Sequence, residues 1–302
     1  MKFKTIIAAA LAVVVSANIS AQTPLWQGKG RIAISSDGNE HDHDDWAATP
    51  LTLALIAAKG LQDKMVLYTY SDHVWGSNQD KPMTHGMTAY EHMRESALGG
   101  AKHFGYDTSR FICAVDNAEV AYKALSDQIN ASSADDPLII IAAGPMQVVG
   151  EAINRSNVEN RQYITVVSHS NWNDRHSDNP HKKNYWDVHS GWTFNKMRSA
   201  FESAEGGSAK FVRILDQNGG DGYIGLYTNM KHYDWIKTSS ARDKAPYQEG
   251  SWDWLYGRIA TCVKKGDNFD PSDAGMVIYL FTGEEKTNPD MAREIMENPI
   301  GL

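Results

Sequence analysis

The densest group of chemically capable side chains lies at residues 36–46, which read Ser-Asp-Gly-Asn-Glu-His-Asp-His-Asp-Asp-Trp. Five carboxylates fall within nine of these residues, and they repel one another unless a cation or a proton is held among them. Oxygen ligands at this density suit Ca²⁺ or Mg²⁺, while the interleaved His41 and His43 keep Zn²⁺ open. The competing interpretation is a solvated acidic loop, with Asp44 or Asp45 stabilised at a helix N-terminus. We expect a metal site and favour Ca²⁺ over Zn²⁺ and Mg²⁺.

A second group, at residues 168–195, combines tryptophans with amide and carboxylate side chains. A sugar ring offers C–H faces for stacking and hydroxyls for hydrogen bonding, so this mixture suits a sugar site. The alternative is a surface loop whose tryptophans pack on the core. Asp72 and Asn78, which follow an apolar run, could face the same cleft. The candidate substrate-binding residues are therefore Asp72, Asn78, His169, Asn171, Trp172, Asn173, Asp174, Trp186, Asp187 and Asn195.

Short apolar runs, each ending at a polar residue, supply the elements that must position these groups. The runs at 31–36, 65–70, 137–143, 163–167 and 211–215 read as strands. Several are continuously apolar, as expected for a parallel sheet covered on both faces. We therefore predict an α/β fold with an open, mostly parallel sheet flanked by helices. Ligands bind beyond the carboxyl ends of such strands, where Asp37, Asp72, Gly144, His169 and Asp216 fall.

Helical patterns occupy the intervals between these strands. The segment 46–61 is rich in Ala and Leu, with Pro50 expected in its first turn. A second helix is expected over 88–98, ending at Gly99 and Gly100. A third is expected to be capped by Asn117 or Asp116, and a short fourth covers 147–154.

The first 21 residues have the form of a secretory signal peptide. A positively charged start is followed by about a dozen apolar residues and then small residues that suit cleavage after Ala21. We expect a secreted or periplasmic protein with one domain over 22–302. No later stretch is apolar enough for a membrane-embedded chain. Cys113 and Cys262 could form one disulfide or stay as free thiols.

Charge narrows the range of partners. The net charge is −8, with no run of Lys or Arg, so few cations are available to displace the counterions of a nucleic acid polymer. We expect a small sugar, nucleoside or glycoside as ligand and no nucleic acid. A homodimer stays open.

Three segments together resemble the inosine–uridine nucleoside hydrolase family. The first is a strand ending in Asp37, followed by the pair Asp44 and Asp45 opening a helix rich in Ala and Leu. The second is 139–153, where an apolar strand runs into Gly-Pro-Met-Gln and a helix. The third is 270–279, which resembles the late segment that returns one more aspartate to the metal. The longer first loop and the signal segment are similar to a secreted, nucleoside-hydrolase-like branch.

This resemblance implies a calcium site and a hydrolytic mechanism. Its ligands would be Asp37 and Asp45, with Asp44 or Asp42 nearby, a backbone carbonyl near Gln147, and Asp273. Calcium would hold a water and lower its pKa, Asp37 would take the proton, and hydroxide would attack the anomeric carbon.

The sequence also departs from the family. Asp37 lies seven residues before Asp44, so the first loop is longer than the family's, and Ser272 stands where purine-cleaving members place a histidine. The ribose-binding Glu-Phe-Asn stretch has no clean counterpart here.

The sequence thus predicts a secreted calcium-dependent hydrolase of a glycosidic or N-ribosidic bond. The alternative from another class is a non-catalytic carbohydrate- or polysaccharide-binding protein on the same fold. A zinc hydrolase built on His41 and His43 would need a third ligand that the spacing does not supply.

Overall fold

The computed structural model describes residues 23–39, 43–76, 79–144, 146–175, 178–179, 189–203, 205, 207–242, 244–263 and 266–299, with backbone alone at 174–175, 178–179 and 189. Its centre is a six-stranded sheet with strand order β3-β2-β1-β4-β5-β8, in which every pair of neighbours is parallel. The strands are β1 (Arg31–Ser36), β2 (Met65–Tyr70), β3 (Phe111–Cys113), β4 (Leu138–Ala143), β5 (Ile164–Ser168) and β8 (Lys210–Arg213). The predicted α/β class is confirmed.

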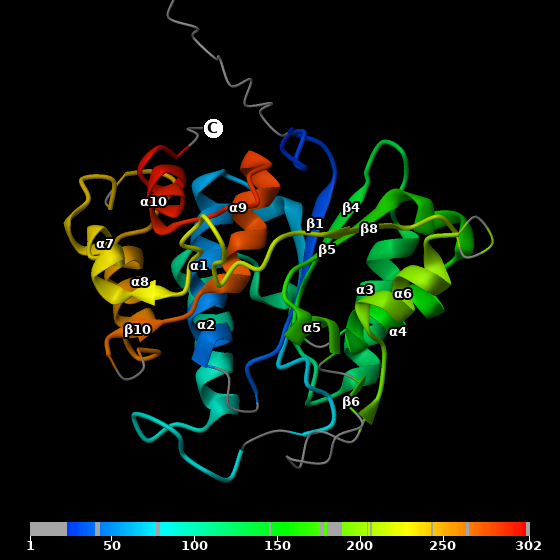
Figure 1. Cartoon of the computed structure of the whole chain (residues 1–302), viewed down its shortest axis with the longest axis horizontal. Coiled ribbons are helices and arrows are strands. Elements are labelled where there is room, and N and C mark those ends of the chain that lie inside the picture. The colour runs from blue at the N-terminus through cyan, green and yellow to red at the C-terminus, as the bar shows by residue number, and fades with distance from the viewer. Residues whose placement is uncertain are drawn as a thin grey trace, which may run out of the picture.

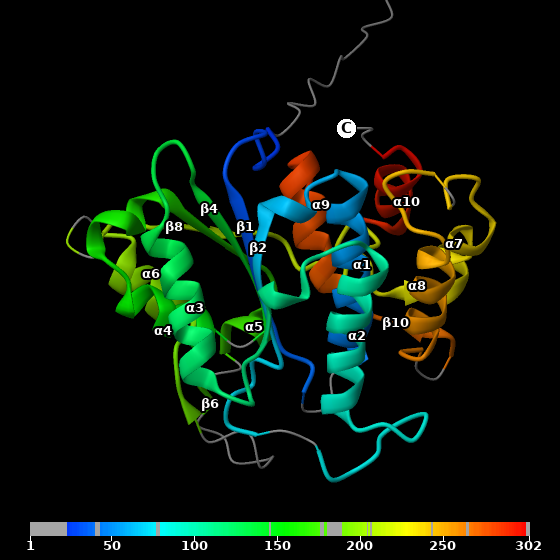
Figure 2. The same ribbon diagram turned by 180° about the vertical axis from the view of Figure 1, so that it is seen from behind.

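Helices cover both faces of this sheet (Figures 1 and 2). On one face α1 (His43–Ala58) and α2 (Ala89–His103) pack on the strands, and α8 (Ser251–Ala260), α9 (Gly275–Thr282) and α10 (Pro289–Glu297) surround α1. On the other face lie α3 (Ala118–Asn130), α4 (Gln147–Arg155) and α6 (Phe194–Phe201). Small elements complete the fold: α5 (Asn171–Arg175), α7 (Trp235–Thr238), and the two-residue strand pairs β6 (Asp178–Asn179) with β7 (His189–Ser190) and β9 (Thr228–Asn229) with β10 (Asn268–Phe269).

Helix α1 begins three residues before the predicted start and is buried from Asp45 to its end. Pro50 is therefore inside the helix, not in its first turn as expected. Proline cannot donate to the carbonyl four residues earlier, which is that of Trp46. The hydroxyl of Ser96 on α2 donates to this carbonyl at 2.7 Å instead. A tertiary hydrogen bond thus replaces the helical one and lets Pro50 stay within α1.

The predicted stop at Gly99 and Gly100 is wrong, because α2 continues to His103. Close packing explains why these positions are glycines. A Cβ on Gly99 would lie 2.5 Å from the ring of Trp254, and one on Gly100 would lie 2.6 Å from Leu53. The predicted cap of the third helix is confirmed: Asn117 caps α3 by accepting from the Val120 N–H at 3.3 Å.

No disulfide joins Cys113 and Cys262. No helix among the described residues is long and apolar enough to cross a membrane.

A buried cation joins α2 and α8 behind α1. The guanidinium of Arg258, 6% exposed, donates to the Ser96 hydroxyl at 2.7 Å and contacts His92 Nδ1 at 3.0 Å. Nδ1 accepts this bond, so the ring proton is on Nε2, which lies 3.0 Å from the Thr84 carbonyl. His92 is therefore neutral in the folded protein. Burial and then Arg258 lower the pKa of His92, outweighing its bond to Thr84.

Because His92 contacts the Arg258 guanidinium, we expect the folded protein to lose stability in mild acid. Below pH 6.5, the ordinary pKa of histidine, the unfolded chain binds a proton that folded His92 refuses. The free energy of unfolding should then fall by up to about 1.4 kcal/mol per pH unit until the folded pKa is reached. Urea unfolding between pH 7.5 and 5 measures this slope. His92→Asn keeps an acceptor for Arg258 but does not titrate, so it should flatten the slope. An unchanged slope in this variant would rule out His92 as its source.

Candidate functional site

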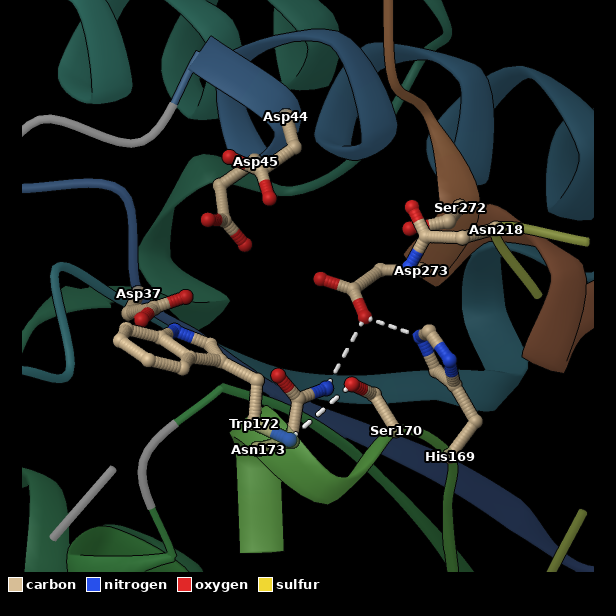
Figure 3. Close-up of a pocket in the computed structure, with 10 residues that line it drawn as sticks. All are labelled: Asp37, Asp44, Asp45, His169, Ser170, Trp172, Asn173, Asn218, Ser272 and Asp273. Carbon is tan, nitrogen blue, oxygen red and sulfur yellow. Dashed lines mark hydrogen bonds and ion pairs between the residues drawn. The ribbon is translucent and has the colours of Figure 1, made fainter. Parts of the chain in front are cut away.

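The candidate site lies at the carboxyl edge of the sheet, between β1 and β4. Here the strand order changes direction, with β2 and β3 on one side and β5 and β8 on the other. Open α/β sheets bind ligands at this switch point. A cavity of about 310 Å³ opens there, and Figure 3 shows the side chains around it. The lining residues are Asp37, Asp44, Asp45, His169, Ser170, Trp172, Asn173, Asn218, Ser272 and Asp273.

Asp37 follows β1 directly and is 4% exposed. Its backbone N–H donates to the Ala143 carbonyl at 3.2 Å, which extends the pairing of β1 with β4. Gly144, the residue that follows β4, has φ +129° and lies against the Asp37 side chain. A Cβ at Gly144 would be 2.4 Å from Asp37 Oδ1. A glycine is thus required for the carboxylate to occupy this place.

Asp44 and Asp45 reach the cavity from the first turn of α1. Asp45 is buried, and the Ser36 hydroxyl lies 3.4 Å from its Oδ1. Gly38, with φ +89°, leaves room for it, because a Cβ there would be 2.8 Å from the Asp45 Cβ. The position of both carboxylates at a helix N-terminus is favourable for negative charge.

Asp273 reaches the cavity from the turn before α9, and two side chains of the 169–173 segment hold it. Its Oδ1 lies 2.7 Å from His169 Nε2 and accepts from Asn173 Nδ2 at 3.2 Å. Burial raises the pKa of Asp273, but these hydrogen bonds outweigh burial and keep the pKa below its usual value. In Figure 3, Asp273 and Asp45 point toward the same space.

The pKa of His169 has opposing influences. Burial lowers this pKa and favours the neutral ring, whereas the carboxylates of Asp216 and Asp273 raise it. Asp216 Oδ1 is 3.6 Å from Nδ1, beyond hydrogen-bond distance, and Nδ1 instead faces the Gln217 N–H at 3.1 Å. A proton on Nδ1 would set two N–H groups against each other. The hydrogen bonds therefore describe the neutral ring with its proton on Nε2.

Asp72 lies beneath the site and is not part of the cavity wall. It is fully buried at the end of β2, where Oδ2 accepts from the hydroxyls of Ser35 and Thr69. Its Oδ1 has no hydrogen-bond partner among the described residues. Burial outweighs the two hydroxyls and, together with nearby Asp37, raises the pKa of Asp72 to about 8. A neutral Asp72 avoids a second buried charge behind Asp37.

The remaining predicted residues divide into three groups. Trp172 lines the cavity and is 55% exposed. Asn171, Asn195 and Gln147 are not in the wall of the cavity. Asn171 accepts from Arg213, and Asn195 is exposed on α6. Gln147, near which a backbone carbonyl ligand was predicted, is the first residue of α4, and its side chain accepts from the Trp192 N–H. Asp42, Asn78, Trp186 and Asp187 lie outside the described residues, as does the side chain of Asp174.

Three cavity residues were not predicted: Ser170, Asn218 and Ser272. Ser170 has φ +61°, unusual for a residue with a side chain, and such strain concentrates at functional sites. Its place three residues after the predicted strand end at 167 was the available signal. Asn218 lies in the segment that follows β8, where its backbone N–H donates to Asp216 Oδ1 at 3.1 Å.

The donors suit a hard cation, although the described residues do not form a closed cage. No group of three His, Cys, Asp or Glu side chains within the described ranges is gathered closely enough to hold an ion as it stands. Asp42, predicted as a ligand, is outside those ranges. The wall of the cavity nevertheless supplies four carboxylates from three segments, and none of its ten residues is Lys or Arg. Such oxygen donors fit Ca²⁺.

Fold and site together define an α/β protein with a carboxylate-rich cavity at the switch point of a doubly wound sheet. No family model matches the chain. The chain is 33% identical to the uncharacterized protein P22 of Formosa agariphila over 270 residues, which are 87% of this chain and 88% of that protein. The chain therefore belongs to the same family as P22.

Proposed function

We propose that this protein is a calcium-dependent hydrolase of a glycosidic or N-ribosidic bond, with Asp37 as the general base. The observation that carries this proposal is the meeting of Asp37, Asp44, Asp45 and Asp273 on one cavity at the switch point. The similarity of the 37–45, 139–153 and 270–279 segments to nucleoside hydrolases supports the same reading. The proposal includes export, with cleavage near Ala21, a position outside the described residues.

The cavity residues divide the work of the reaction. Asp37, fixed by Gly144, would take a proton from the attacking water. Trp172 would stack on the ring of the substrate, and Asn218 would bind a hydroxyl. The carboxyl groups of Asp45 and Asp273 would stabilise positive charge that develops on the sugar as the bond breaks.

Asp37, Asp45 and Asp273 would hold the calcium, with Asp44 or Asp42 completing the set. When bound, Ca²⁺ would lower the pKa of a water molecule and anchor sugar hydroxyls.

A hydrolysis screen tests the proposal. The mature protein is incubated with purine and pyrimidine nucleosides and with nitrophenyl glycosides, with Ca²⁺ or with EDTA, and released sugar is measured. We expect calcium-dependent release from at least one class. If no substrate is cleaved while sugars still bind, the alternative of a non-catalytic carbohydrate-binding protein holds. The exposed side chain of Trp172 favours that alternative, because a sugar can be bound by stacking on a tryptophan ring without being cleaved.

Asp45→Ala should remove both calcium binding and the stability that calcium confers. Asp45 is 3% exposed and faces the cavity from α1. Its substitution by alanine therefore removes a carboxylate ligand from the buried side of the proposed calcium site. We expect calorimetry to show at least about tenfold weaker calcium binding, since a charged ligand is lost. Asp290→Ala, an exposed first-turn carboxylate of α10, controls for the helix-dipole effect. Equal calcium affinity in the two variants would remove Asp45 from the ligand set.

A further inference from the structure

Gln217 is a fully buried side chain in the segment that follows β8. Its amide nitrogen donates to the carbonyls of Leu215 at 2.7 Å and Glu285 at 2.9 Å, and its Oε1 accepts from the Thr287 hydroxyl at 2.6 Å. Its backbone N–H donates to His169 Nδ1 at 3.1 Å. A buried amide with this many partners has one orientation. Gln217 therefore fixes the position of its own backbone N–H.

The same side chain packs against the start of α9. A Cβ on Gly275 would lie 2.4 Å from Gln217 Oε1, so the first residue of the helix must be glycine for this contact. Gly275 is only two residues after Asp273. Gln217 thus contacts the chain on both sides of the cavity: His169 through its backbone, and the segment carrying Asp273 through its side chain.

Both ring nitrogens of His169 are engaged by these contacts. Nδ1 accepts from Gln217, and Nε2 is 2.7 Å from Asp273 Oδ1. The ring is 1% exposed, although it forms part of the cavity wall. Figure 3 shows the ring directed at Asp273 and not at the open space. Neither nitrogen is free to accept a proton from a substrate, so His169 serves Asp273.

We propose that Gln217 is a positioning residue that holds the His169 ring with its proton on Nε2 and thereby directs the Asp273 carboxylate into the cavity. The consequence for calcium rests on the proposed function, whereas the arrangement of Gln217 and His169 does not. Gln217 and His169 are thus positioning residues that act through Asp273.

Nitrogen NMR of the full chain tests the arrangement without activity or metal. In protein labelled with ¹⁵N-histidine, the His169 signals are assigned by their absence in His169→Gln. In the wild-type protein we expect a pyridine-type Nδ1 and a pyrrole-type Nε2. Gln217→Leu should give a mixture of the two tautomers of His169. Gln162→Leu, which changes an exposed glutamine, is the control and should leave the His169 spectrum unchanged. A doubly protonated ring, a proton on Nδ1, or an unaltered spectrum in Gln217→Leu would overturn the proposal.

Two substitutions of His169 separate positioning from simple loss of packing. A glutamine amide places a donor near the former Nε2 and keeps the bond to Asp273. An asparagine places its amide near the former Nδ1 and loses that bond. We expect His169→Gln to stay within about threefold of wild-type calcium affinity and His169→Asn to fall about tenfold or more, because a charge-assisted hydrogen bond is lost.

Equal losses in the two variants would show that His169 only fills space and would overturn the proposal. A wild-type protein that binds no calcium would instead contradict the proposed function. In that case the histidine spectrum still decides the role of Gln217, so the two failures are distinguishable.

Discussion

Asp37→Asn is expected to abolish turnover while leaving most sugar binding intact. The amide has nearly the shape of the carboxylate, so it fits against Gly144, but it cannot accept the proton of the attacking water. Loss of a general base costs about 10²- to 10⁴-fold in rate. The kcat on the best substrate and the Kd for the corresponding free sugar are the two quantities to compare, because a base contributes to the first and little to the second.

Asp63→Asn, an exposed carboxylate far from the cavity in the turn before β2, is the matched control and should be indistinguishable from wild type. Calcium affinity of Asp37→Asn must also be measured, since Asp37 is a proposed ligand. Turnover within a few-fold of wild type would show that Asp37 is not the base. Turnover lost only in proportion to calcium would make Asp37 a ligand alone.

Gly144→Ala should destabilise the fold and displace Asp37. The new Cβ would lie 2.4 Å from Asp37 Oδ1 and 2.6 Å from its Cγ, and φ at this residue is +129°. Backbone strain of about 1–3 kcal/mol adds to an overpacking cost of about 1–3 kcal/mol. We expect the free energy of unfolding to fall by about 3 kcal/mol, together with the loss of turnover.

Gly222→Ala separates the two contributions. Gly222 also has a positive φ, +82°, but a Cβ there meets no atom within 4 Å. This variant should lose only the strain, about 1–2 kcal/mol, and keep its turnover. Equal losses for Gly144→Ala and Gly222→Ala in urea unfolding would show that Asp37 is not seated against Gly144.

The sheet was largely predictable because its strands are buried on both faces. Leu138–Ala143 is continuously apolar and Met65–Tyr70 nearly so, and the structure has strands at both places. The strand Arg31–Ser36 also has the predicted bounds. β3 escaped prediction because it has only three residues, Phe111–Cys113, too few for a period to show. The start of α1 was predicted too late because Pro50 was expected in the first turn. The hydroxyl of Ser96, which takes the place of the missing N–H of Pro50, is distant in sequence.

The site was predictable to the extent that strand ends determine it. Asp37 and His169 follow β1 and β5, and parallel strands bring their carboxyl ends to one edge. Sequence could not show that His169 is bonded to Asp273, 104 residues later, or that Gln217 occupies its other nitrogen. Such pairings arise from tertiary packing and carry no local pattern. Asp72 also follows a strand, yet its side chain is fully buried and does not line the cavity.

The metal content of the purified mature protein tests the central claim most directly, combined with thermal melting in EDTA and in Ca²⁺. We predict about one calcium ion per chain and a large fall in Tm when EDTA removes it, restored by Ca²⁺, because ligand binding to the folded state adds to stability. Zinc in place of calcium would move the site to the histidines. A protein that contains no metal and melts identically in EDTA and Ca²⁺ would contradict the calcium site and, with it, the proposed hydrolase.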